Sequence, residues 1–429
     1  MVDVTRWREV HRLAVAGAEA DIARDTGRRL GLWLLARSHF ADAESIATAT
    51  LTLGPDPYSF YNRGWARWAT GRPGPGLGDY RQALELYRRA GDRGNEAATL
   101  NGIGTVHQST GELRQALDHF RQSLPIALET GERAAEAATL HNIGRVYDVL
   151  GDPRQAVDHY RRALSIRQEI GDRAGEAATL NNIGYTYAGL GDRRQALDHY
   201  RRALSILREV GDLAGEAAVL NNTGIVHQGL GDLRLALDHY RLALSVRREI
   251  GDRAGEAVVL NNIGSVFERS DDRHQAADHY RLALSLMRET GARAAEASTL
   301  NNIGLLHHRA GELPQALEHY RLALSIAREV GDRAGEASIL NNIGGVHDRL
   351  GDQRQSLEHF RQTLAIRQEI GDRDGEAATR RNIAMTHRVL GDLTAAVAEL
   401  EQVVELDRRT ERPDLEADVA LLDRVRKEL

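Results

Sequence analysis

The segment GDRAGEAATLNNIGYTYAGLGDRRQALDHYRRALSILREV occupies residues 171–210, and close copies of it fill residues 91–410 with a period of 40. A period near 40 is typical of two-helix repeats and of propeller blades, so the local spacing of apolar residues has to decide between them. Leu180, Ile183 and Tyr187 recur at three- and four-residue intervals, which indicates an α-helix and not a strand. The sequence therefore predicts an all-α repeat protein.

Each copy contains a second helix after a short break. In this copy the break lies at Gly191, which suits the left-handed position after a helix, and Asp192, which suits a helix N-cap. Gln195 completes a capping-box pattern three residues after the aspartate. We call the helix before this break the A helix and the helix after it the B helix. Because the connections are short, consecutive helices are predicted to pack antiparallel.

The large and small residues of each unit resemble the pattern of the tetratricopeptide repeat (TPR) family. That pattern has a large apolar, a small and an aromatic residue on the A helix, then alanine, an aromatic residue and alanine on the B helix. The matching residues are Leu180, Gly184, Tyr187, Ala196, Tyr200 and Ala203. The resemblance implies a right-handed TPR α-solenoid, a superhelix of antiparallel helix pairs. The usual proline near the end of the unit is absent, and the longer unit resembles repeats of kinesin light chain, spindle-orientation adaptors and bacterial TPR signalling regulators.

Three regions are expected along the chain. Residues 1–90 are predicted to form an N-terminal cap with degenerate TPR-like helices, residues 91–410 eight 40-residue units, and residues 411–429 a C-terminal capping helix. Within the cap, the glycines and prolines of residues 71–78 predict a loop. All four tryptophans also lie in the cap: Trp7, Trp33, Trp65 and Trp68. The closing helix is expected to carry one apolar stripe: Leu415, Val419, Leu422, Val425 and Leu429.

The composition excludes several kinds of protein. Without cysteine, the chain has no thiol nucleophile, disulfide or thiolate metal site. Lys427 is the only lysine, so the Gly-Lys-Ser/Thr loop of a P-loop nucleotidase is absent. The formal net charge of -6 argues against general nucleic-acid binding, and the sequence has no run of 18 apolar residues that would predict a membrane span. No secretory signal is recognisable, so we expect a cytoplasmic protein without a cofactor.

Seven histidines occupy one B-helix position, one residue before an aromatic residue that is expected to pack in the core. They are His119, His159, His199, His239, His279, His319 and His359. Equivalent positions in neighbouring units are expected roughly 10 Å apart, the usual distance between packed helices. This is too far for shared metal ligation, in which the bonds are about 2 Å long. We therefore interpret these histidines as packing residues and expect neither a metal site nor catalytic residues.

The A helices carry asparagines near their centres, in two series. The first series, which we call the ladder asparagines, is Asn142, Asn182, Asn222, Asn262, Asn302, Asn342 and Asn382. The preceding position carries Asn101, Asn181, Asn221, Asn261, Asn301 and Asn341, and Gly102 replaces the first ladder asparagine. Asparagine inside a helix costs roughly 0.5 kcal/mol relative to alanine, so an offsetting interaction is expected.

Two roles for these asparagines are open. The TPR resemblance implies that A helices line a concave groove, and that asparagines at the position of Asn182 contact the backbone of bound peptides, as in O-GlcNAc transferase and kinesin light chain. A side-chain amide suits this role because it can donate and accept hydrogen bonds at once. Alternatively, the amides bond neighbouring helices and were copied together with the repeat.

Two A-helix positions near the ladder vary between units. Three residues after the ladder position stand Thr105, Arg145, Tyr185, Ile225, Ser265, Leu305, Gly345 and Met385. Six residues after it stand Gln108, Asp148, Ala188, Gln228, Glu268, His308, Asp348 and Arg388. Variable side chains beside a generic backbone contact would give a groove its sequence preference, and neutral drift at exposed sites is the alternative. The candidate peptide-binding residues are therefore both asparagine series with Arg145, Tyr185, Ile225 and Leu305.

One B-helix surface is unusually apolar. Leu242, Leu282 and Leu322 replace the arginine or glutamine found at this position in other units, and Leu235 lies seven residues before the first of them. Contiguous exposed apolar surface often marks a contact with a partner, so this patch predicts self-association.

Together these features favour a non-enzymatic scaffold that binds a protein or an extended peptide in the groove. The alternative is a TPR regulatory or sensor protein of a bacterial signalling system, such as a peptide receptor or the partner of a separate effector. The excess of arginine over lysine suggests a GC-rich bacterial genome.

Overall fold

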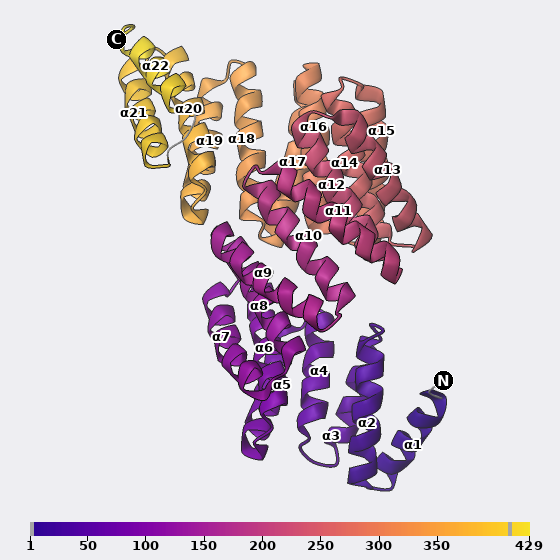
Figure 1. Ribbon diagram of the computed structural model, residues 1–429. Coiled ribbons are helices and arrows are strands. Elements are labelled where there is room, and N and C mark those ends of the chain that lie inside the picture. Colours follow the sequence, from indigo (N-terminus) through magenta and orange to yellow (C-terminus); the bar gives the residue numbers. More distant parts are fainter. Residues whose placement is uncertain (1–3, 411–413) are drawn as a thin grey trace. The chain divides into compact units, whose positions relative to one another are not determined.

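A computed structural model describes residues 4–410 and 414–429, and these contain 22 α-helices and no β-strand (Figure 1). The predicted all-α class is confirmed. The chain divides into two compact units, Met1–Gly215 and Glu216–Leu429. Within the described ranges, no helix is both long enough and apolar enough to cross a lipid bilayer.

The helices of the first unit alternate along the chain between A and B helices after an initial α1. They are α1 (Val4–Ala16), α2 (Ala20–Leu35), α3 (Phe40–Leu51), α4 (Pro57–Ala69), α5 (Pro73–Ala90), α6 (Arg93–Ser109), α7 (Leu113–Thr130), α8 (Arg133–Val149), α9 (Pro153–Glu169), α10 (Arg173–Gly189) and α11 (Arg193–Val210). The boundary between the two units falls inside α12 (Leu213–Leu230).

The second unit continues the same alternation. Its helices are α13 (Leu233–Glu249), α14 (Arg253–Arg269), α15 (Arg273–Thr290), α16 (Arg293–Ala310), α17 (Leu313–Val330), α18 (Arg333–Arg349), α19 (Gln353–Ile370), α20 (Arg373–Val389), α21 (Leu393–Thr410) and α22 (Leu415–Arg426). The even-numbered helices α2 to α20 are A helices. In at least nine of the ten pairs, the A helix packs against the B helix that follows it.

The break at Gly191 and Asp192 has the predicted chemistry except for one half of the capping box. Gly191 has a φ of 79°, and the Asp192 carboxylate accepts a hydrogen bond from the Gln195 backbone N–H at 3.1 Å. The second half of the expected capping box is not formed. The Asp192 N–H donates instead to the Tyr187 carbonyl oxygen at 3.0 Å, which closes the end of α10 and leaves no donor for the Gln195 side chain.

Close approach of the two helices in a pair depends on a small A-helix residue. A Cβ on Gly184 would lie 2.7 Å from the ring of Tyr200, whose side chain is only 1% exposed. The α20/α21 pair has Ala384 at the glycine position, and there the B-helix position carries Leu400 instead of a ring. The extra methyl group is therefore found where the facing side chain is smaller.

Arginine–glutamate networks join consecutive helices at the start of several A helices. The buried carboxylate of Glu296 accepts from Arg288 Nε on the preceding B helix at 2.9 Å and from Arg293 Nη1 at 2.6 Å. Arg293 Nη2 also contacts Glu329 on the following B helix at 2.6 Å. Because Glu296 is buried and satisfied by two cations, this network fixes three helices relative to one another.

Two expectations for the ends of the chain are wrong in detail. Residues 71–78 are not all loop, because α5 begins at Pro73; prolines fit the first helical turn, where their missing N–H has no helical partner to lose. Leu429 lies beyond α22 and is 69% exposed, so it does not join Leu422 and Val425 in the core. Residues 1–3 and 411–413, which belong to the expected terminal regions, lie outside the described residues.

Candidate functional site

The ladder asparagines and those of the preceding series lie on the A helices, where A helices of successive repeats touch. Within each unit, A helices contact each other directly, as α6 contacts α8 and α14 contacts α16. All thirteen asparagines of the two series are partly buried. Their amides are therefore near enough to bond across repeats while remaining partly accessible.

In the second unit, each ladder asparagine after α12 donates a hydrogen bond to the asparagine of the preceding series in the previous repeat. The Nδ2–Oδ1 distances are 2.8 Å for Asn262 to Asn221, 3.1 Å for Asn302 to Asn261, 2.9 Å for Asn342 to Asn301 and 3.0 Å for Asn382 to Asn341. In the first unit, Asn142 donates to Asn101 at 2.7 Å. The structural alternative, that these amides bond neighbouring helices, is confirmed for these pairs, in each of which a ladder asparagine bonds an asparagine of the preceding series.

His141 takes the place of an asparagine in an equivalent pair. Its Nε2 lies 3.1 Å from Asn182 Nδ2, and its Nδ1 lies 3.2 Å from Thr179 Oγ1. Burial, followed by the positive charges of Arg167 and Arg145, lowers the pKa of His141 to about 3. The imidazole is therefore neutral near pH 7 and can accept the hydrogen bond from Asn182. Sequence reasoning missed this residue because it recorded only asparagines at the preceding position.

The variable positions border hollows beside the ladder. Arg145 and Tyr185 are exposed and line a hollow of about 280 Å³ together with Asn181 and Asn182. In the second unit, a hollow of about 250 Å³ is lined by Leu305, Asn341, Asn342 and Asn382, among others. Ile225 lies on α12 with 48% of its surface exposed. The structure thus brings several predicted site residues together in two separate places.

Some residues six positions after the ladder have internal partners. The hydroxyl groups of Tyr160, Tyr240 and Tyr280 donate at 2.8 Å to Asp148, Gln228 and Glu268 respectively, each within one repeat. Burial raises the pKa of Asp148. These positions therefore vary in residue type while several keep an acceptor for the B-helix tyrosine.

An aromatic cluster on α4 was not predicted as a site. The segment YNRGWARW at residues 61–68 aligns with NNIGYTYA at residues 181–188, so the buried Asn62 occupies the ladder position. Trp65 and Trp68 then stand at the two variable positions. A strict 40-residue offset from Gly102 would have revealed this, but the degenerate sequence of the cap concealed it.

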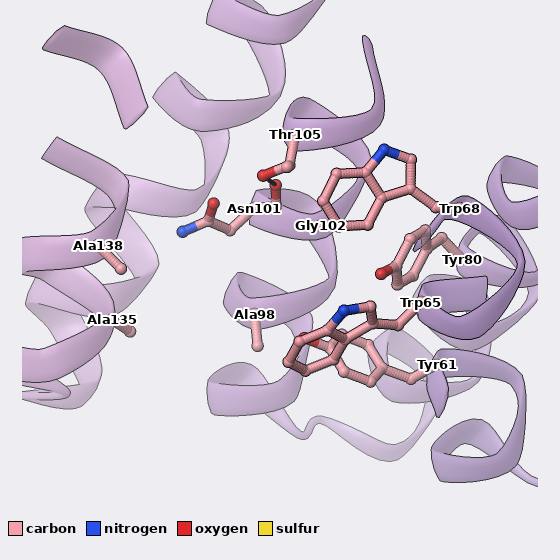
Figure 2. A pocket seen from close by; sticks show the side chains of 10 residues that line it. All are labelled: Tyr61, Trp65, Trp68, Tyr80, Ala98, Asn101, Gly102, Thr105, Ala135 and Ala138. Carbon is pink, nitrogen blue, oxygen red and sulfur yellow. Dashed lines mark hydrogen bonds between the residues drawn. The ribbon is translucent and has the colours of Figure 1, made fainter. Parts of the chain in front are cut away.

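These rings line a pocket of about 310 Å³ between α4, α5 and the A helices α6 and α8. Figure 2 shows Tyr61, Trp65, Trp68 and Tyr80 on one side of this aromatic pocket and Gly102 on the facing helix. The ring of Tyr61 is edge-on to those of Trp65 and Tyr80, with centroids 6.3 and 5.4 Å apart. The rings therefore support one another in fixed orientations.

The repeated B-helix histidines pack within their own repeats, as interpreted from the sequence. Ring centroids lie 5.1–5.5 Å apart in the pairs His119–His107, His159–Tyr147, His199–Tyr187, His239–His227, His279–Phe267, His319–His307 and His359–His347. Across residues 4–410 and 414–429, no group of three or more histidine, cysteine or acidic side chains is arranged to hold a metal ion.

The leucine patch of the second unit is exposed as expected. Leu235, Leu242, Leu282 and Leu322 are 45%, 51%, 54% and 48% exposed, respectively. They lie on the B helices α13, α15 and α17, away from the ladder positions in sequence. Their role in self-association stays a prediction.

Several solved structures are similar to this chain. The apo form of RapI has a TM-score of 0.60 and 15% identity over 82% of this chain and 99% of its own. A Rap protein complexed with Competence and Sporulation Factor gives 0.58 and 14% over 82% and 99%. The apo quorum sensor NprR from B. thuringiensis gives 0.57 and 15% over 80% and 98%. At these identities the likeness shows a shared fold only. No curated protein matches the sequence.

The repeats themselves match a known family. A profile described as tetratricopeptide repeat matches residues 59–129, 95–169, 135–209, 215–289 and 295–369, and a second such profile matches residues 382–410. The matches cover most of the chain and include the α4/α5 pair of the cap. The chain is therefore a helical solenoid that belongs to the tetratricopeptide repeat family.

Proposed function

We propose that this protein is a non-enzymatic binding module that holds an extended peptide or protein segment along its A helices. The observation that carries the proposal is the row of partly accessible amides beside hollows lined by Arg145 and Tyr185 in one unit and by Leu305 in the other. Backbone groups of a peptide would meet the amides, and its side chains would enter the hollows.

The bonds between repeats are compatible with this role. A bond such as Asn302 to Asn261 uses one of the two N–H groups of the donor amide, and a side-chain amide has two donors and two acceptor lone pairs. The bond also fixes the orientation of the amide before a ligand arrives. A preorganised amide loses less conformational entropy on binding than a freely rotating one.

The hollows differ in chemistry, which supports a preference for particular side chains. The hollow of the first unit presents a cation, Arg145, beside the ring of Tyr185. The hollow of the second unit presents Leu305 and Met385. The hollow of the first unit would match an acidic or aromatic side chain, and that of the second unit an apolar side chain.

A second candidate is a regulator that senses a peptide and passes the signal to a separate effector. The likeness to RapI and NprR favours this role through the fold alone. It uses the same site, so the first question for both candidates is whether a peptide binds along the A helices.

The test selects random dodecapeptides displayed on phage against the full chain and measures their affinities by fluorescence polarisation. We expect Arg145→Ala and Tyr185→Ala to weaken selected peptides by about tenfold or more, because both side chains are exposed on the proposed surface. Arg202→Ala, an exposed B-helix change, is the matched control and should alter affinity less than about twofold. Peptides that bind all variants equally would contradict the proposal.

A further inference from the structure

The aromatic pocket lies where the ladder lacks an asparagine. Gly102 occupies the ladder position of α6, and a Cβ there would lie 3.1 Å from the ring of Tyr80. In later repeats this position carries a side-chain amide. Because Gly102 has no side chain, the pocket between α4 and α6 extends to the edge of the Tyr80 ring.

Tyr80 presents an unused hydroxyl group to this space. Its side chain is only 3% exposed, and Figure 2 shows the hydroxyl oxygen pointing into the pocket. Among the described residues, no hydrogen-bond partner is found for this group; the equivalent Tyr160 and Tyr240 have one, and Tyr320 has none. The Tyr80 hydroxyl oxygen is not one of the buried atoms that lack a partner, so it is open to the pocket, and a ligand with a polar edge would bond it in place of water.

The rest of the lining is uncharged and held in place. None of the ten residues that line the pocket is acidic or basic. The indole N–H of Trp68 donates to Ser109 Oγ at 2.9 Å, which orients that ring. Asn101 and Thr105 add polar groups from the same face of α6 that carries the ladder. An occupant should therefore be neutral, largely apolar and flat, with a hydrogen-bonding edge.

We propose that the aromatic pocket receives one tryptophan or tyrosine side chain of a bound peptide. A tryptophan N–H or a tyrosine O–H would reach the Tyr80 hydroxyl while the ring packs against Trp65 and Tyr61. The inference rests on the proposed function in assigning the side chain to a peptide. The pocket is continuous with the A-helix face, since Asn101 both lines it and accepts the hydrogen bond from Asn142.

The experiment uses the full chain labelled with ¹⁵N-tryptophan, whose four indole N–H groups give four NMR signals. N-acetyl-tryptophanamide and N-acetyl-tyrosinamide are titrated as unlabelled probes. We expect saturable shifts of the Trp65 and Trp68 signals, with Trp7 and Trp33 as internal references. Equal shifts of all four signals, or no shift, overturn the inference. Equal shifts with N-acetyl-leucinamide would indicate a non-selective hydrophobic pocket and also overturn the inference. Stronger shifts with tetramethylammonium would indicate a cation-binding pocket and overturn it as well.

Two variants test the geometry. Tyr80→Phe keeps the ring and removes the hydroxyl, and should weaken the tryptophan probe by about three- to tenfold. Tyr200→Phe, the same change at the equivalent position of a later repeat, is the control and should leave the shifts unchanged. Gly102→Asn should fill the pocket and abolish the shifts, with thermal unfolding recorded to confirm folding. Unchanged probe binding in both pocket variants overturns the inference.

Failure of this inference is distinguishable from failure of the proposed function. If displayed peptides bind along the A helices but the probes give no shifts, only the pocket assignment fails. If the probes bind and no displayed peptide depends on Arg145 or Tyr185, the peptide assignment is overturned together with the proposed function.

Discussion

The repeat α4/α5 and the repeat α10/α11 share a framework and differ on one face. In both, a glycine of the A helix faces a buried tyrosine of the B helix, Gly64 against Tyr80 and Gly184 against Tyr200. The residues that let the two helices approach are thus kept even where the rest of the sequence is degenerate. The framework is set by packing, which tolerates few alternatives at these positions.

The difference lies at the positions beside the ladder. Trp65 and Trp68 of α4 replace Tyr185 and Ala188 of α10, and α6 has Gly102 where α10 has Asn182. These changes convert an amide-lined surface into an aromatic pocket without altering the pairing of helices. The lesson is that packing positions fix the fold, while a few accessible A-helix positions differ between repeats and, under the proposed function, would set what each repeat binds.

The largest expected effect comes from breaking the shared framework. Gly184→Ala places a methyl group against the Tyr200 ring and should lower the free energy of unfolding by about 2 kcal/mol. Gly189→Ala, on the same helix with open space around it, is the matched control and should be neutral or slightly stabilising. Urea denaturation measures both. Equal effects of the two changes on the free energy of unfolding would show that the contact with Tyr200 does not restrict the size of residue 184.

A second comparison sets the His141 repeat against repeats with asparagine at that position. The folded-state pKa is lowered to about 3, so below the ordinary histidine pKa of about 6.5 the unfolded chain binds a proton that the folded chain does not. Stability from this group is complete above pH 6.5 and falls as pH decreases, by at most about 1.4 kcal/mol per pH unit. Denaturation between pH 7 and pH 5 should show a steeper loss for the natural chain than for His141→Asn. Parallel curves would contradict this account.

A smaller effect is expected within the ladder. Asn302→Ala removes a donor from Asn261, whose Oδ1 also accepts from Thr299 at 3.0 Å, so the loss should be about 0.5 kcal/mol. Asn262→Ala removes the donor from Asn221, and Val259 stands where a threonine could have compensated, so about 1 kcal/mol is expected. Thermal unfolding of both variants checks the order. The reverse order would argue against a structural role for these bonds.

The smallest expected change concerns assembly and leaves the fold intact. Replacing Leu242, Leu282 and Leu322 with glutamine, the residue at this position in other repeats such as Gln122, should remove any self-association through the patch. Sedimentation equilibrium should then give a lower average mass than for the natural chain, with unchanged helicity. A natural chain that is monomeric at all concentrations would rule the prediction out.

The sequence allowed prediction of the helix pairs because their determinants are local and repeated. Glycine at the break, aspartate at the cap and a small residue opposite a ring each act within one repeat. The partners of the asparagines could not be read in the same way, because each bond joins residues 41 apart on different helices. The aromatic pocket was not predicted because its parts come from repeats that differ. The loop predicted at residues 71–78 is wrong from Pro73 onward, because proline is also suited to the first turn of a helix.

The constant separation of 41 residues in the Asn142, Asn262 and Asn302 bonds has a consequence for how such a chain can change length. Gain or loss of one whole 40-residue copy would leave every amide donor opposite an equivalent acceptor, whereas a gain of one residue would misalign all bonds at that junction. Recombination between copies within the gene can therefore lengthen or shorten the array while preserving its junctions. The number of repeats is in this sense adjustable without any new interface.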